Sequence, residues 1–129
     1  MGISETRRME QLANTKAIHI TQLGVIAALV DGEASQIEVD TLVAKVSERY
    51  KISADEVARL AAGMIGFYQS QQIGNSPAVA LHFAGKSLDN LSAHDKKVAF
   101  DIAQEVILSG GVDAMEQGFL AQLKHFTRV

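Results

Sequence analysis

The segment Leu29-Val30-Asp31-Gly32-Glu33-Ala34-Ser35-Gln36-Ile37-Glu38 joins two apolar helical patterns through a glycine turn. Ahead of the turn, apolar residues follow the i, i+3, i+4, i+7 spacing of one helix face, at Leu23, Ile26, Ala27 and Val30. Ser35 and Glu38 have the spacing of a capping box, in which each side chain accepts a hydrogen bond from the other residue's backbone N–H. The segment therefore predicts a helix that ends near Asp31, a stop at Gly32 and a second helix that begins at Ser35.

A second copy of this pattern is the segment Leu108-Ser109-Gly110-Gly111-Val112-Asp113-Ala114-Met115-Glu116. When Gly32 is placed on Gly110, the two copies align without a gap and Glu38 meets Glu116. We interpret the two segments as diverged helix–turn–helix repeats within one fold.

Further helix starts are marked by Ser53-x-x-Glu56, by Ser76-Pro77 and by Ser92-x-x-Asp95, and Asp113-x-x-Glu116 has the same spacing. The last helix is expected to turn Met115, Phe119, Leu123 and Phe126 inward, and the mid-helix Gly63 and Gly66 are expected to permit close helix packing. No segment alternates apolar and polar residues, so no sheet is predicted. The expected fold is an all-α, single-domain bundle of about six or seven helices. Residues 1–16 form an N-terminal extension or helix start, and residues 17–129 form the helical domain.

Composition excludes several classes of protein. The chain has 129 residues, the size of one domain, and its net charge of −3 provides no basic surface for nucleic acid. It has no cysteine, which excludes disulfides, thiolate metal sites and cysteine nucleophiles. Its longest apolar run, Val25 to Val30, is far shorter than the ~20 residues that span a bilayer, and no apolar segment adjoins Arg7-Arg8 as in a signal peptide. We therefore expect a cytoplasmic protein with no transmembrane segment.

The two copies together resemble the TerB-like family of bacterial tellurite-resistance proteins over residues 17 to 126. In that family an apolar helix ends in Ala/Ser-Asp-Gly and is followed by a few polar residues, a Glu and a second apolar helix, once in each half. The resemblance implies an all-helical bundle linked to tellurite resistance and other stress responses, with a metal-related or scaffolding role. The second copy departs from the pattern where Ser109 replaces the Asp.

Asp31, Glu33 and Glu38 are the candidate metal ligands, because several oxygens near free helix carbonyls suit Ca²⁺ or Mg²⁺. Asp31 stands at a helix C-terminus, where the helix dipole disfavours an anion. The alternatives are an exposed aspartate at Asp31 and simple helix capping by Glu38 and Glu116. In the second copy, Asp113 and Glu116 are the weaker counterparts.

Three functions remain open. The sequence has no HExxH, ExxH or GxSxG motif, so we favour a non-enzymatic module that acts through protein partners, with weak binding of a divalent cation. A self-associating protein is compatible with this hypothesis. The second hypothesis is an enzyme whose site forms from Asp31, Glu33, Asp101 and Glu105, which requires these carboxylates to converge in one pocket. The third is a structural adaptor, which would present a large exposed apolar patch.

Overall fold

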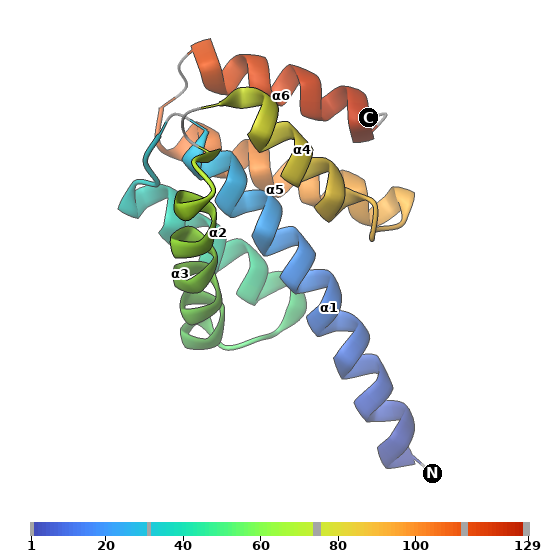
Figure 1. The fold of residues 1–129 in the computed structure, drawn as a ribbon. Coiled ribbons are helices and arrows are strands. Elements are labelled where there is room, and N and C mark those ends of the chain that lie inside the picture. The colour runs from blue at the N-terminus through green and yellow to red at the C-terminus, as the bar shows by residue number, and fades with distance from the viewer. Residues whose placement is uncertain (1, 31, 74–75, 112–113, 128–129) are drawn as a thin grey trace.

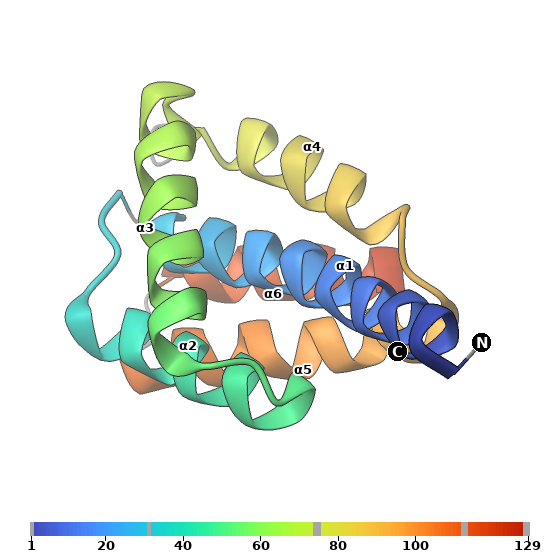
Figure 2. The same ribbon diagram turned by 90° about the horizontal axis from the view of Figure 1, so that it is seen from below.

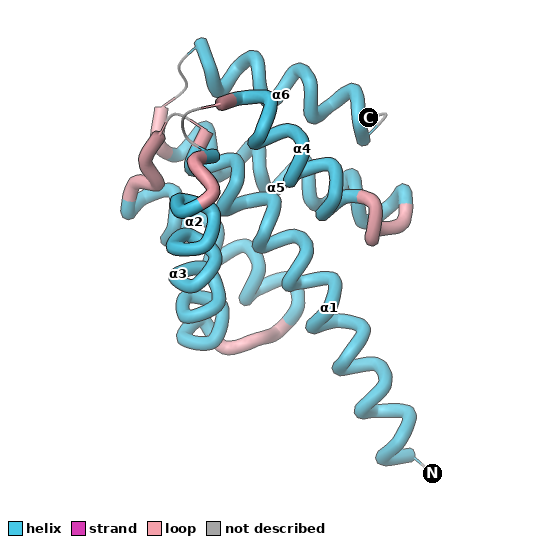
Figure 3. Tube along the Cα trace, in the orientation of Figure 1, coloured by secondary structure: helices cyan, strands magenta, loops and turns pink. Residues whose placement is uncertain are grey.

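The computed structural model describes residues 2–30, 32–73, 76–111 and 114–127, and these residues form six α-helices and no strand. The helices are α1 (Gly2–Leu29), α2 (Gln36–Tyr50), α3 (Ala54–Ser70), α4 (Pro77–Leu88), α5 (Ala93–Ser109) and α6 (Ala114–Thr127), joined by short loops (Figures 1 and 3). The expected all-α bundle is confirmed at this level. Within the described residues, no helix is both long and apolar enough to cross a membrane.

The C-terminal half of α1 is the centre of the bundle. Helices α2, α3, α4 and α5 all pack against it, and α6 packs on α4 and α5 (Figure 2). A helix surrounded in this way has to be apolar on every side. The run from Val25 to Val30 satisfies this condition, since each of its residues is buried. The residues before position 17 belong to the same helix, because α1 begins at Gly2.

The helix starts confirm the predicted serine caps. Ser35 and Glu38 form a complete capping box at the start of α2. The side chains of Ser53, Ser76 and Ser92 each accept a hydrogen bond from the backbone N–H three residues later. The predicted cap at Asp113 lies outside the described residues.

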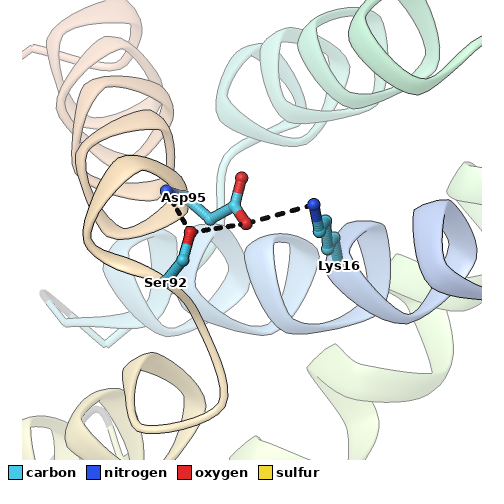
Figure 4. A network of polar contacts seen from close by, with 3 residues as sticks. All are labelled: Lys16, Ser92 and Asp95. Carbon is cyan, nitrogen blue, oxygen red and sulfur yellow. Dashed lines mark hydrogen bonds and ion pairs between the residues drawn. The ribbon is translucent and has the colours of Figure 1, made fainter.

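A polar network around the buried Asp95 links the start of α5 to α1. The hydroxyl of Ser92 donates to Oδ2 of Asp95 at 2.9 Å, and the Asp95 backbone N–H donates to the Ser92 hydroxyl at 3.2 Å (Figure 4). The ammonium group of Lys16 lies 3.3 Å from the same Asp95 oxygen. Capping and ion pairing thus anchor this end of α5 at the level of Lys16 on α1.

Tyr68 links α3 to the other side of the bundle. Its buried ring packs edge-on against Phe83 of α4, with the ring centroids 5.6 Å apart. Burial raises the pKa of Tyr68 above its ordinary value, although a hydrogen bond with Ser87 acts in the opposite direction. The Ser87 hydroxyl in turn donates to Gln22 of α1 at 3.1 Å.

The expectation that Gly63 and Gly66 permit close helix packing is wrong. Gly63 and Gly66 are exposed, and a Cβ atom added to either would meet no described atom within 4 Å, so they do not serve close helix packing. The close approach occurs at Gly24 of α1, where a Cβ would overlap a methyl group of Leu42 of α2. The absence of a side chain at Gly24 therefore lets α2 pack tightly on α1.

Met115 was expected to face inward and is exposed instead. The inner face of α6 is formed by Glu116, Phe119 and Leu123, which share the i, i+3, i+7 spacing. Phe119 and Leu123 thus face inward as expected, and only the first inner position differs, because Glu116 rather than Met115 occupies it. The side chain of Phe126, also expected to face inward, lies outside the part of the chain whose side chains the structure describes.

Candidate functional site

The two motif copies meet at one end of the bundle, where α1 and α5 end and α2 and α6 begin (Figure 1). We call this the paired-turn end and define it as residues 30–38 and 108–116, apart from 31, 112 and 113. Its central contact joins the two copies: a Cβ atom added to Gly110 would lie 2.7 Å from Cγ and 2.8 Å from Cδ of Glu38. The glutamate of the first copy therefore packs directly on the turn of the second.

The backbone conformations of the two turns do not follow the gapless alignment of their sequences. Gly32 and Gly111 have positive φ angles of 106° and 85°, a conformation that glycine adopts without steric cost. Gly110, the residue aligned with Gly32, has φ −94° and forms the C-cap of α5. Gly111 is therefore the conformational counterpart of Gly32, and Gly110 is required for another reason, the close approach of Glu38.

Glu38 is held in place by its own helix start. The Ser35 backbone N–H donates to Glu38 Oε1 at 3.0 Å, and the Glu38 N–H donates to the Ser35 hydroxyl at 3.2 Å. The residue is nevertheless only 3 % exposed, because it continues the inner stripe of Leu42 and Val46 on α2. The predicted capping role is confirmed, and the burial of this carboxylate is an additional feature that surface capping does not require.

Glu116 occupies the equivalent place in the second copy. It lies in the first turn of α6, where the helix dipole favours a negative charge, and it is only 1 % exposed. Both segments thus bury a glutamate near the start of the helix that follows the turn. The surroundings are asymmetric, because Glu38 contacts Gly110, whereas a Cβ atom on Gly32 would meet no described atom within 4 Å.

The remaining predicted ligands do not complete a metal site within the described residues. Glu33 is exposed in the loop between α1 and α2. Asp31 and Asp113 lie outside the described residues. Among the residues that the structure does describe, no three His, Asp or Glu side chains gather closely enough to hold a metal ion. The metal site at Asp31, Glu33 and Glu38 therefore stays a prediction.

Three large apolar side chains of the paired-turn end are exposed. Ile37 is 60 % exposed, Leu108 57 % and Met115 44 %. Ile37 and Met115 precede Glu38 and Glu116 and correspond to each other in the two copies, whereas Leu108 lies two residues before Gly110. We call these three residues the turn-end apolar patch. Large exposed apolar side chains are a feature of surfaces that bind another protein.

The described carboxylates of the enzyme hypothesis, Glu33, Asp101 and Glu105, do not converge in one pocket, and Asp31 lies outside the described residues. Asp101 and Glu105 are exposed and line a groove of about 370 Å³ between α2 and α5, whose lining does not include Glu33. The Lys45 ammonium lies 2.7 Å from Glu105 Oε2, and this hydrogen bond raises the pKa of Lys45. A carboxylate occupied by an ion pair at an open groove is typical of a solvated helix surface.

Sequence reasoning identified Glu38 and Glu116 but not their burial, and it missed the contact between Glu38 and Gly110. One signal was available: Gly110-Gly111 supplies two glycines where a single positive φ angle needs only one. The additional glycine indicates a close approach by another residue, although its identity depends on the tertiary fold.

Comparison with known proteins gives no match to a family model, to a curated protein or to a solved structure. The resemblance to the TerB-like family therefore depends on the two motif copies alone.

Proposed function

We propose that this protein is a non-enzymatic binding module of the TerB-like type, which acts through a protein partner docked at the paired-turn end. The observation that carries the proposal is the contact of Glu38 with Gly110, which brings together the two segments that carry the exposed residues of the turn-end apolar patch. The resemblance supplies the setting, a cytoplasmic stress-response or tellurite-resistance system of a bacterium.

The partner's surface should be apolar at its centre and basic at its rim. Ile37, Leu108 and Met115 provide apolar anchors, whose burial contributes about 25 cal/mol per Å² before the costs of association are subtracted. Glu33, in the loop before α2, and Asp40, in the first half of α2, are exposed and supply negative charge. Such rim charges steer association and select the partner more than they add affinity.

The buried glutamates suggest a second ligand at the same end, a divalent cation such as Ca²⁺ or Mg²⁺. Carboxylate oxygens are the ligands that these hard cations prefer. Glu38 and Glu116 would contribute to the site together with Asp31, the acidic residue of the first turn. Binding there would stiffen the two turns and so present the turn-end apolar patch to the partner.

The partner proposal can be tested by site-specific photocrosslinking in cells that produce the protein. A photoreactive amino acid at position 37 or 115 should yield a discrete crosslinked protein, and Leu108→Glu should reduce that adduct at least tenfold. The control position is 97, where an exposed lysine lies on α5 outside the patch. Equal crosslinking at 37, 115 and 97, or an adduct unaffected by Leu108→Glu, would exclude a partner at this end.

A further inference from the structure

The N-terminal half of α1 extends beyond the body of the bundle (Figure 1). Helix α1 has 28 residues, whereas the other helices have 12 to 17. The ion pair between Lys16 and Asp95 marks the level at which α5 begins, and α1 continues for about 20 Å past it at 1.5 Å per residue. In the sequence of this projecting half, apolar residues continue the spacing of the buried Ala17 and Ile20, at Met9, Leu12 and Ala13.

An apolar groove begins where α1 leaves the bundle. Its first part has a volume of about 240 Å³ and is lined mainly by apolar residues of α1, α2, α3 and the loop between α2 and α3, among them Ala17, Ile18, Ile52 and Leu60. A second hollow of about 400 Å³ shares Leu60 and continues along α3 past Gly63, Met64 and Phe67. We call the two together the α1–α3 groove. Ile18 and Phe67 are among the exposed large apolar residues of the chain.

We propose that the projecting half of α1 docks in the α1–α3 groove of a second copy, and that the protein forms a two-fold symmetric antiparallel dimer. Each copy supplies one projecting helix and one groove, so a single symmetric arrangement covers both grooves at once. Leu12 then lies opposite Ile18 of the other copy and Ala13 opposite Ala17, with the symmetry axis near Thr15. The apolar positions of the projecting half are thereby placed against the apolar wall of the groove.

Charge is compatible with this occupant. Residues 2–14 contain two acidic and two basic residues, Glu5, Glu10, Arg7 and Arg8, and so carry no net charge. The groove walls contribute one residue of each sign, Glu56 and Arg59. Docking therefore brings together two surfaces without net repulsion.

The expected contact area indicates a weak dimer. A projecting helix about 20 Å long and about 10 Å wide covers about 200 Å² on each surface that it joins. Both symmetric contacts together bury about 800 Å², and seating in a concave groove raises this towards the ~1,200 Å² lower limit of standard interfaces. We therefore expect a dissociation constant in the micromolar range.

Cysteine crosslinking tests the alignment in the full chain, which contains no native cysteine. The variant with both Leu12→Cys and Ile18→Cys should form a disulfide-linked dimer upon mild oxidation. Within one chain the two positions are about 9 Å apart along the helix, too far for a disulfide. The single variants are the matched controls, because the antiparallel alignment also separates position 12 from its symmetric copy by about 9 Å. Equal crosslinking of a single variant, or none in the double variant, would overturn the proposal.

Sedimentation equilibrium tests the groove. The native chain should change from monomer to dimer across the micromolar range, and Phe67→Glu should weaken the dimer at least tenfold. The matched control is Leu108→Glu, since Leu108 is 57 % exposed and Phe67 54 %, and it should leave the dimer unchanged. A chain that stays monomeric up to ~1 mM, or a dimer weakened equally by both substitutions, would show that the groove does not receive a second copy.

Discussion

Replacing Gly110 by alanine tests whether the two motif copies meet as described. The φ angle of Gly110, −94°, is allowed for alanine, so the substitution adds one methyl group without backbone strain. That methyl would lie 2.7 Å from Cγ and 2.8 Å from Cδ of Glu38. Glu38 has little freedom to move, because its Oε1 accepts the hydrogen bond from the Ser35 backbone N–H.

The magnitude follows from three contributions. Overpacking of a buried site costs about 1–3 kcal/mol, and losing the capping interaction accounts for about 1 kcal/mol of this if Glu38 swings away. Replacing glycine restricts the unfolded chain and returns about 0.4–1 kcal/mol. We therefore expect Gly110→Ala to lower the free energy of unfolding by about 1–2 kcal/mol, and the melting temperature by roughly 4–8 °C.

The assay is urea unfolding of four proteins: the native chain, Gly110→Ala, Glu38→Ala and the double variant. Removing the Glu38 side chain should leave Gly110→Ala nearly without cost, which gives a coupling free energy of at least ~1 kcal/mol. Gly118→Ala is the matched control, because Gly118 lies within α6 and its Cβ would meet no described atom within 4 Å. That control should stabilise the fold by about 0.5–1 kcal/mol. A stable Gly110→Ala protein, or an equal cost in both backgrounds, would refute the contact between the copies.

Two further predictions concern ligands and pH. Ca²⁺ or Mg²⁺ at ten times its dissociation constant should stabilise the native chain by ~1.4 kcal/mol, or roughly 4–8 °C in melting temperature. The substitution Asp31→Asn should abolish this shift, whereas the control substitution Glu48→Gln, at an exposed glutamate, should preserve it. No shift in the native chain, together with a stabilised Asp31→Asn protein, would mean that Asp31 is only a badly placed charge. Burial raises the pKa of Tyr68 above its ordinary value of 10.0, so above pH 10 this tyrosine ionises in the unfolded chain before it does so in the folded one. The contribution of Tyr68 to the free energy of unfolding should therefore be fully present below pH 10 and decline as the pH rises beyond it. Tyr68→Phe should reduce this decline in urea unfolding at high pH, and an unchanged decline would contradict the role of Tyr68.

Local sequence was sufficient for the helix starts. Ser35, Ser53, Ser76 and Ser92 each satisfy a backbone N–H only three residues away, so the interaction depends on nothing outside its own turn. The central position of α1 was not predicted, because only one apolar face was assigned to this helix, although the run from Val25 to Val30 is apolar on every side.

The first inner position of α6 and the roles of the glycines could not be predicted in this way. Met115 and Glu116 both fit the start of a helix, and only packing against α4 and α5 determines which of them turns inward. Gly24, Gly63 and Gly66 have similar helical contexts in the sequence. Only the position of Leu42 on another helix distinguishes the glycine that permits close packing from the two that do not.

At the paired turns, too, some features follow from the local sequence and others only from the tertiary structure. The sequence by itself determined that each copy has a glycine stop followed by a helix with a glutamate in its first turn, because these features depend on residues within four positions of one another. Only the tertiary structure placed Glu38 on Gly110 and buried both glutamates, because that contact joins residues far apart in the chain. Its geometry depends on how α2 and α5 pack around α1, and no local pattern contains that information.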